Sequence, residues 1–127
     1  NQELATIRQE RIRNVKVAII NNGYLGMVRQ WQELFEGRRY SGTPLSGPCF
    51  ARLAEAYGLL GVTVERTEDV GDAIALAQDH DDAVVIDFRV EREANVFPIV
   101  PAGRSIGEMI TAHEPNDRHE QTQTLRT

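Results

Sequence analysis

The sequence is short of cysteine, of positive charge and of long apolar runs, and each shortage excludes a class of protein. Cys49 is its one cysteine, so no disulfide can form within the chain. The 19 acidic residues outnumber the 14 basic ones and leave a formal charge of −5, so we expect no nucleic-acid partner. No apolar run approaches the roughly 20 residues that span a bilayer, and no basic-then-apolar signal opens the chain. We therefore expect a soluble, cytoplasmic protein with no membrane partner.

What is present fits one globular domain. The chain has 127 residues, and hydrophobic residues make up 41% of it before its 10 glycines are added. That share is close to the average for globular domains, which excludes disorder throughout the chain. From His113 onward the sequence is polar, and we expect residues 113–127 to form a disordered tail.

Apolar patterning predicts strands that alternate with helices. The runs at residues 15–20 and 83–88 have the composition of strands buried on both faces of a parallel sheet, and a third, short strand is predicted at 62–64. Helical spacing and a capping-box pattern predict helices over residues 2–12, 25–36, 50–57, 67–78 and 105–112. This alternation is typical of an open, mostly parallel α/β sheet with helices on both faces. Three strands are fewer than the usual five or so, and we expect the C-terminal part of a larger domain.

The turn after the first predicted strand is the first place to look for chemistry. In an open α/β sheet, ligands bind beyond the carboxyl ends of the strands, which is where Asn21-Asn22-Gly23 lies. An asparagine side-chain oxygen suits Mg²⁺, and a glycine lets the backbone come close to phosphates. Asn-Gly is also among the commonest turn dipeptides, so the turn taken alone favours a plain structural interpretation.

Three separated stretches together resemble one enzyme family. They are residues 21–31 (NNGYLGMVRQW), residues 1–6 (NQELAT) and residues 95–103 (NVFPIVPAG). Over residues 1–111 the sequence resembles the catalytic large subunit of acetolactate synthase, also called acetohydroxyacid synthase. The resemblance implies that residues 1–112 are the C-terminal part of a domain that binds thiamine diphosphate (ThDP). Enzymes of this family join two 2-oxo acids with loss of CO₂ in branched-chain amino acid biosynthesis.

The resemblance also implies which residues hold the cofactor. The signature of this superfamily opens with Gly-Asp-Gly and closes with Asn-Asn, and the sequence contains only the closing part. Asn22 would give Mg²⁺ its side-chain oxygen, and Tyr24 would give its backbone carbonyl. The residues that would wrap the diphosphate are Asn22, Gly23, Tyr24, Leu25, Gly26 and Met27. The aspartate that supplies a further metal ligand, the activating glutamate and the FAD-binding domain are not in the sequence, so we expect no catalytic residue in it.

Met27, Val28 and Trp31 match family positions that line the substrate channel. The plainer interpretation is that they belong to the buried stripe of an amphipathic helix, and for Val28 it is at least as good. A large aromatic residue such as Trp31, close to a ligand-bearing turn, suits a pocket wall. Residues 95–103 match the segment that closes over the active site, or else form a surface loop.

The expected partners follow from the same resemblance. It implies ThDP and Mg²⁺ as cofactors, FAD in the parent enzyme, and pyruvate and 2-oxobutyrate as substrates. It also implies upstream domains of the same subunit, a homo-oligomer and a regulatory small subunit. Another ThDP-dependent carboligase or a pyruvate oxidase would share the Asn-Asn close but less of residues 26–31. A non-catalytic, truncated α/β binding module is the alternative from a different class.

Two other groups of residues are weaker candidates. Cys49 follows Pro48 at the start of a predicted helix, but a lone cysteine is more often a small buried hydrophobe. Residues 79–82 (DHDD) have the composition of a metal cluster, but a solvated turn before a strand is the simpler interpretation.

Overall fold

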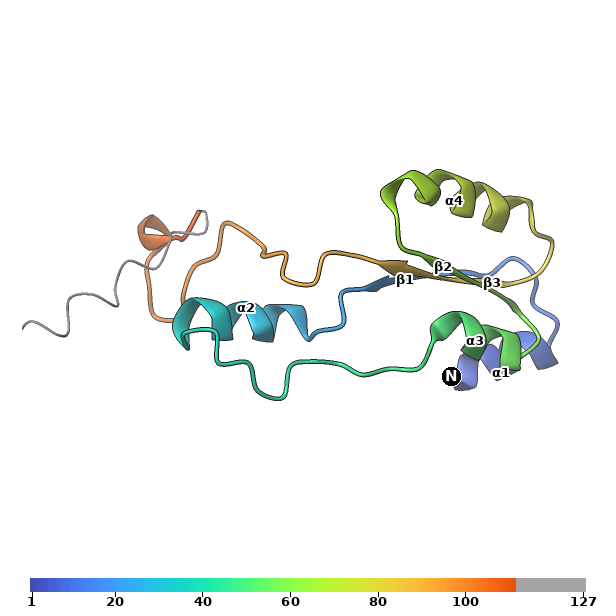
Figure 1. The fold of residues 1–127 in the computed structure, drawn as a ribbon, viewed down its shortest axis with the longest axis horizontal. Helices are drawn as coiled ribbons and strands as arrows, with labels where there is room; N and C mark the ends of the chain where they lie inside the picture. Colours follow the sequence, from blue (N-terminus) through green and yellow to red (C-terminus); the bar gives the residue numbers. More distant parts are fainter. Residues whose placement is uncertain (112–127) are drawn as a thin grey trace, which may run out of the picture. The chain divides into compact units, whose positions relative to one another are not determined.

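The computed structural model describes residues 1–111, which divide into two compact units, residues 1–94 and the described residues from 95 onward. The first unit contains the helices α1 (Gln2–Gln9), α2 (Gly26–Phe35), α3 (Phe50–Ala56), η1 (Thr67–Asp69, 3₁₀) and α4 (Val70–Asp79), and the strands β1 (Lys16–Asn21), β2 (Leu60–Val64) and β3 (Val84–Arg89) (Figure 1). The second contains the 3₁₀ helix η2 (Ile106–Glu108). The element bounds in the first unit lie within three residues of the predicted ranges. The tail expected at 113–127 lies outside the described residues.

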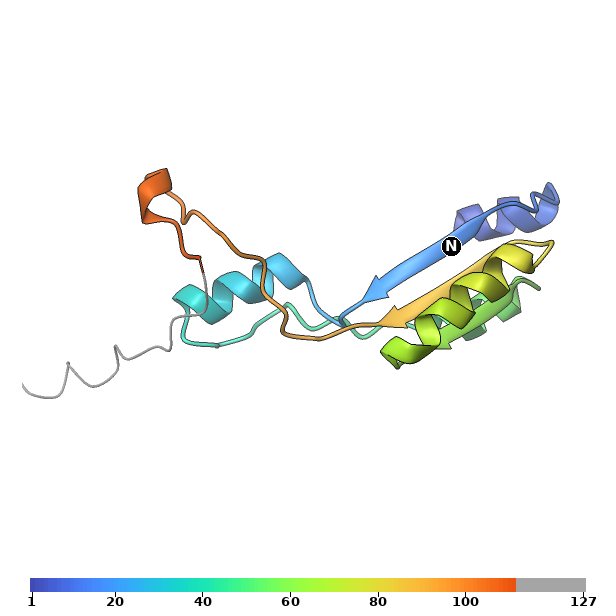
Figure 2. The ribbon, with the colours of Figure 1, turned by 90° about the horizontal axis from the view of Figure 1, so that it is seen from above.

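The three strands form a parallel sheet in the order β1-β3-β2 (Figure 2). The last strand of the chain therefore lies between the other two. The register places Ile19 of β1 and Thr63 of β2 on either side of Asp87. Because all three strands run in the same direction, their carboxyl ends meet at one edge of the sheet. The predicted parallel sheet is confirmed.

Helices cover both faces of this sheet (Figure 1). One apolar cluster lies between α4 and the sheet and consists of Val64, Ala73, Ala77, Val84 and Ile86. The cluster on the other face consists of Ala54, Leu59, Ala83 and Val85, with Leu4 and Ile7 of α1 packed against it. Since β3 contributes to both clusters, it is the centre of the fold, and the predicted two-sided cover is confirmed.

Helix α3 lies directly against β2 at Gly61. A Cβ atom on this residue would overlap the main chain of Ala51 in α3. Only glycine allows backbone to lie against backbone in this way. The contact fixes α3 on the sheet, and with it the end of the loop that returns from α2.

The predicted burial of residues 15–20 on both faces is wrong. Alternate residues of β1 are exposed, and Ile20 keeps 69% of its surface accessible. The reason is position, because β1 is at the edge of the three-stranded sheet while β3 is central and buries residues 84–87. A short apolar run has the same composition in a central strand and in an edge strand.

The helix predicted over residues 105–112 is also wrong. The capping box between Ser105 and Glu108 forms, but the helical geometry ends with η2. Met109 takes an extended conformation, with φ −64° and ψ 143°. Ile110 then exchanges two backbone hydrogen bonds of 2.8 and 2.9 Å with Ile99. This pairing satisfies the backbone groups that a longer helix would have used. Residue 112 lies outside the described residues.

Candidate functional site

The Asn-Asn-Gly turn leaves the carboxyl end of β1 and leads into α2. The side-chain nitrogen of Asn21, Nδ2, donates to Asp87 Oδ1 at 3.0 Å, and Asn21 Oδ1 accepts the backbone N–H of Gly23 at 3.1 Å. Gly23 has a φ of +70°, a conformation that costs glycine little. Both ends of the Asn21 side chain are therefore used to hold the turn against the central strand.

Asp87 is a fully buried carboxylate at the centre of the sheet. Asp87 Oδ1 accepts the hydrogen bond from Asn21. Asp87 Oδ2 lies 3.1 Å from Arg89 Nη2, in an ion pair that is not aligned as a hydrogen bond. The sequence reasoning missed Asp87. An acidic residue that interrupts an apolar strand near its carboxyl end is the signal that could have found it.

Asn22 is arranged differently from Asn21. Its Oδ1 accepts the backbone N–H of Tyr24 at 3.1 Å, and since an amide oxygen has two lone pairs, one position remains for a cation. Within the described residues the carbonyl oxygen of Tyr24 accepts no hydrogen bond. A Cβ on Gly26 would lie 3.1 Å from Asn22 Nδ2, so this glycine leaves room for the asparagine. Two neutral oxygen donors in one turn are the donor type that Mg²⁺ takes.

The start of α2 adds an anion-binding element to the turn. No described side chain caps this helix, and its first turn contains no acidic residue. The unpaired N–H groups of the first turn and the positive end of the helix dipole favour a negative group there. The guanidinium of Arg92 lies 5.0 Å from the ring centre of Tyr24 and adds positive charge beside the turn. The residues present thus fit the diphosphate of a cofactor together with its metal ion.

The loop after α2 also holds the turn, through backbone hydrogen bonds. Leu45 N–H donates to the carbonyl of Gly23 at 2.8 Å, and Leu25 N–H donates to the carbonyl of Thr43 at 2.9 Å. These bonds flank an antiparallel bridge between Tyr24 and Pro44. The backbone of the turn is therefore held both by β3, through Asn21, and by this loop.

Met27, Val28 and Trp31 lie on the exposed side of α2. They keep 49%, 50% and 39% of their surfaces accessible. Trp31 packs edge-on against Phe35, with 5.4 Å between ring centroids. The buried side chains of α2 are polar instead: Arg29, Gln30 and Glu33. The plainer interpretation, in which these three side chains belong to a buried stripe, is wrong for the described residues. The sequence reasoning missed the polar buried side.

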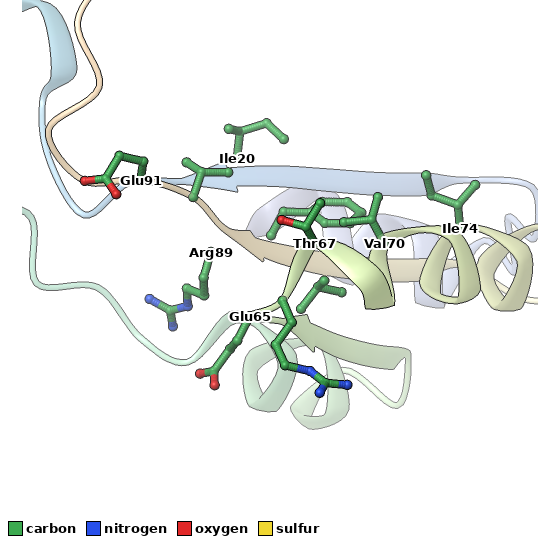
Figure 3. Close-up of a pocket in the computed structure, with 11 residues that line it drawn as sticks. Ile20, Glu65, Thr67, Val70, Ile74, Arg89 and Glu91 are labelled. Carbon is green, nitrogen blue, oxygen red and sulfur yellow. The ribbon is translucent and has the colours of Figure 1, made fainter.

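A hollow of about 670 Å³ lies elsewhere, at the carboxyl ends of β2 and β3 beside α4 (Figure 3). Its apolar lining is Ile20, Val64, Val70, Ile74, Phe88 and Val90, and its charged lining is Glu65, Arg66, Arg89 and Glu91. It opens on the α4 face of the sheet. Because side chains alternate along β3, Asp87 lies on the opposite face from Ile86 and does not line this hollow. The hollow therefore offers an apolar surface apart from the Asn-Asn-Gly turn.

The two weaker candidates have different outcomes. Within residues 1–111, no group of three or more His, Cys, Asp and Glu side chains is placed to hold a metal ion, so residues 79–82 are not a metal cluster. Cys49 is exposed, so the interpretation of this residue as buried is wrong. No helix in the same described part is long and apolar enough to cross a membrane.

The Asn-Asn-Gly turn and nearly all of its sheet lie in the part of the chain that matches a known protein family. The family model of thiamine pyrophosphate enzymes, C-terminal TPP binding domain, matches residues 1–88. The chain belongs to this family. TPP and ThDP are the same cofactor, so the predicted membership of a ThDP-binding family is confirmed, while the bounds 1–112 of the domain stay a prediction. The match does not test which residues bind the cofactor, the metal or a substrate, and those assignments stay predictions.

Relatives of this TPP-binding domain include acetolactate synthases. The large subunit of Mycobacterium tuberculosis is 53% identical over 118 residues, which cover 88% of this chain and 19% of the relative. The large subunit of Corynebacterium glutamicum is 41% identical over 140 residues, covering 94% and 22%. A solved structure, the ThDP-dependent 4-hydroxybenzoylformate decarboxylase of Rhodococcus jostii RHA1, is similar with a TM-score of 0.60 and 31% identity, covering 69% of this chain and 16% of that one. The chain thus spans about a fifth of the length of the curated relatives.

Proposed function

We propose that this chain is the cofactor-binding part of an acetolactate synthase, a transferase that depends on ThDP and Mg²⁺. The enzyme would decarboxylate pyruvate and condense the product with a second pyruvate or with 2-oxobutyrate. The observation that carries the proposal is the turn itself, where the open lone pair of Asn22, the carbonyl of Tyr24 and the uncapped start of α2 come together. The 53% identity to a mycobacterial large subunit supports this activity over other ThDP chemistry.

Each part of the site would have a distinct task. Asn22 and Tyr24 would hold the metal ion, and the backbone of residues 22–27 would bind the diphosphate. When bound, ThDP supplies the nucleophilic carbon and the electron sink for decarboxylation. The apolar side chains of Met27, Val28 and Trp31 would form a channel wall that excludes water and contacts the acceptor acid.

The rest of the enzyme would lie outside these residues. We propose upstream domains of the same subunit that bring the remaining metal ligand and an FAD site, and an earlier domain of the neighbouring subunit that brings the activating glutamate. A homo-oligomer in the cytoplasm with a regulatory small subunit completes this proposal. The structural similarity to a ThDP-dependent decarboxylase keeps another enzyme of the superfamily as the second candidate. A gene without an in-frame Gly-Asp-Gly upstream would instead support a non-catalytic binding module.

The first prediction is that the 127-residue chain alone makes no acetolactate. It contains the Asn-Asn close of the cofactor signature but neither the opening Gly-Asp-Gly nor an activating glutamate in the matching motifs. The assay supplies pyruvate, ThDP and Mg²⁺ and measures acetolactate colorimetrically. The comparison is the complete polypeptide encoded by the same gene, for which we expect turnover.

Two results would contradict the proposed function. One is turnover by the 127-residue chain well above a blank without protein. The other is a complete polypeptide that binds ThDP and decarboxylates a 2-oxo acid but forms neither acetolactate nor acetohydroxybutyrate. That second result would favour a different ThDP enzyme.

A further inference from the structure

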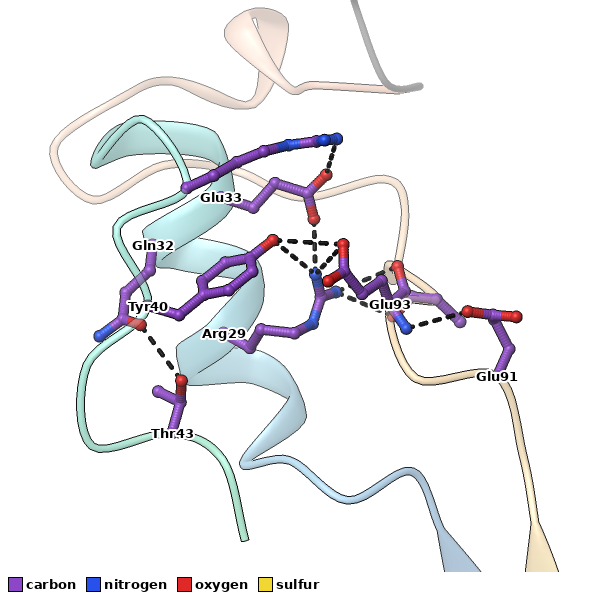
Figure 4. A network of polar contacts seen from close by, with 9 residues as sticks. Arg29, Gln32, Glu33, Tyr40, Thr43, Glu91 and Glu93 are labelled. Atoms are coloured by element: carbon purple, nitrogen blue, oxygen red, sulfur yellow. Dashed lines mark hydrogen bonds and ion pairs between the residues drawn. The ribbon is translucent and has the colours of Figure 1, made fainter.

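Arg29 is a fully buried arginine that joins three separate segments of the first unit (Figure 4). Its Nη1 pairs with Glu33 Oε2 at 2.6 Å, one turn along α2, and lies 3.5 Å from the hydroxyl of Tyr40 in the following loop. Its Nη2 donates to the carbonyls of Glu93 and Ala94 at 3.2 and 3.3 Å. The guanidinium thus connects α2 to the loop after it and to the segment that follows β3.

The partners of Arg29 are themselves held in place. Glu33 Oε1 accepts a hydrogen bond of 2.9 Å from Nη2 of a second arginine, Arg38. The backbone of Arg38 is left-handed, with a φ of 60°. The hydroxyl of Tyr40 donates to Glu93 Oε2 at 3.4 Å. The loop and the segment after β3 are therefore bonded to each other as well as to the helix (Figure 4).

The same side of α2 is connected to the Asn-Asn-Gly turn through Gln32. Its side chain exchanges hydrogen bonds of 2.9 and 3.0 Å with the backbone of Ser41, and it accepts the hydroxyl of Thr43 at 3.3 Å. Thr43 is buried and accepts the backbone N–H of Leu25. A continuous set of contacts therefore runs from the polar side of α2 to the turn.

A buried ion pair of this kind is a device for geometry more than for stability. Replacing buried ion pairs with apolar side chains is often neutral or stabilising, because desolvation of the charges offsets their attraction. Burial acts to lower the pKa of Arg29, but hydrogen bonds to Glu33 and Tyr40 raise it above its ordinary value, so the group stays charged. The planar fork of an arginine binds several acceptors in fixed directions.

The direction matters because the two sides of α2 differ. Successive residues of a helix are turned by about 100°, so anchoring Arg29 toward the loop and the segment after β3 also fixes where Val28 and Trp31 point. Both of these apolar side chains are exposed on the helix. Rotation of α2 by one residue would bring either Gln30 or Gln32 to the place of Trp31.

We propose that Arg29 is a positioning residue that fixes the rotation of α2, and thereby the place of Trp31 and Val28 beside the cofactor turn. The inference rests on the proposed function, because it assigns those two side chains to the acceptor side of the site. Arg29 itself touches neither cofactor nor substrate in this proposal. Its effect on the choice of acceptor acid is transmitted by α2.

The first test follows Trp31 directly. Trp31 is the one tryptophan of the 127-residue chain, so its fluorescence reports on α2 without interference. We expect Arg29→Met to lower the fluorescence anisotropy of Trp31 and to increase its quenching by acrylamide. The matched control is Arg39→Met, because the Arg39 side chain is exposed and bonds to Glu36, to the carbonyl at 3.0 Å and to the carboxylate at 3.4 Å. Unchanged anisotropy and quenching in Arg29→Met would overturn the inference, whatever the activity of the complete enzyme.

The second test measures acceptor choice in the complete enzyme. Pyruvate and 2-oxobutyrate compete, and the ratio of acetohydroxybutyrate to acetolactate is measured beside ThDP affinity and a melting curve. We expect Arg29→Met to move the ratio toward equal use of the acceptors by roughly 3–10-fold, part of the 10–200-fold that one methylene can give. ThDP affinity should change less than the ratio. Arg29→Lys, which keeps the charge but not the fork, should give a smaller shift.

The outcomes separate the two proposals. A lower melting temperature with an unchanged ratio, measured where the protein is folded, would show a merely structural role and overturn the positioning inference while leaving the proposed function intact. If Arg29→Met does not fold, Glu33→Gln and Arg29→Lys take its place, and an unchanged ratio in both overturns the inference. A wild-type enzyme that forms neither product contradicts the proposed function, and the Trp31 measurement still decides whether Arg29 holds α2.

Discussion

Replacing Asn22 with alanine is expected to lower ThDP affinity by about 10-fold or more and to lower Mg²⁺ affinity with it. Asn22 Oδ1 carries one hydrogen bond, from Tyr24 N–H, and keeps an acceptor position for the metal. Mg²⁺ requires a nearly octahedral shell, so the loss of one protein oxygen cannot be made good by a small shift of the others. The measurement is a titration of the complete enzyme with ThDP at fixed Mg²⁺, followed by the reverse titration.

The matched control for this prediction is Asn21→Ala in the same turn. The Asn21 side chain donates from its nitrogen to Asp87 and accepts Gly23 N–H at its oxygen, so it is held toward the central strand and joins the turn to it. Its removal leaves the buried Asp87 with one partner fewer and should cost about 1–3 kcal/mol of unfolding free energy, with a smaller change in ThDP affinity. Small and equal effects of both substitutions on ThDP binding would return the turn to a plain structural role.

Trp31→Leu is expected to change the preference between acceptors and to leave stability nearly unchanged. The two acids differ by one methylene, and a hydrophobic contact distinguishes such a pair by roughly 10–200-fold. A buried tryptophan would instead leave a cavity and cost roughly 2–4 kcal/mol. Trp31 is 39% exposed and packs on Phe35, which is 43% exposed, and this favours the first outcome.

The test of Trp31 is a competition assay with a melting curve recorded on the same protein. The product ratio of acetohydroxybutyrate to acetolactate gives the preference. Ile74→Ala is the control, because it removes an apolar side chain of similar exposure, 44%, from α4. A large drop in melting temperature with an unchanged product ratio would assign Trp31 to the core of the protein and defeat its place in the channel.

The parts of the fold that sequence predicted are those that local chemistry decides. Gly37 and Gly58 take positive φ angles where helices were expected to end. The apolar run of β3 identified a buried strand because that strand is central. The same reasoning was wrong for β1, since strand order depends on pairings that no local pattern records.

In the candidate site too, sequence could identify residues that a local motif defines but not those that distant partners define. Asn22 could be found from a turn at the end of a strand, because a short motif contains both the ligand and its geometry. Arg29 could not be found in this way, since its acceptors at Glu93 and Ala94 are 64 and 65 residues away in the chain. The i,i+4 spacing of Arg29 and Glu33 predicts an exposed helical pair as readily as a buried one. Long-range partners, not the helix itself, decide which side of α2 is buried.

The exposure of Cys49 affects how the association of this protein is measured. As an accessible thiol that is also the only one in the chain, it can join two copies through an intermolecular disulfide under oxidising conditions. A covalent dimer formed in this way would run at twice the monomer mass in sizing and scattering experiments and would imitate a biological oligomer. The oligomeric state of this protein should therefore be measured in the presence of a reductant or on the Cys49→Ser variant.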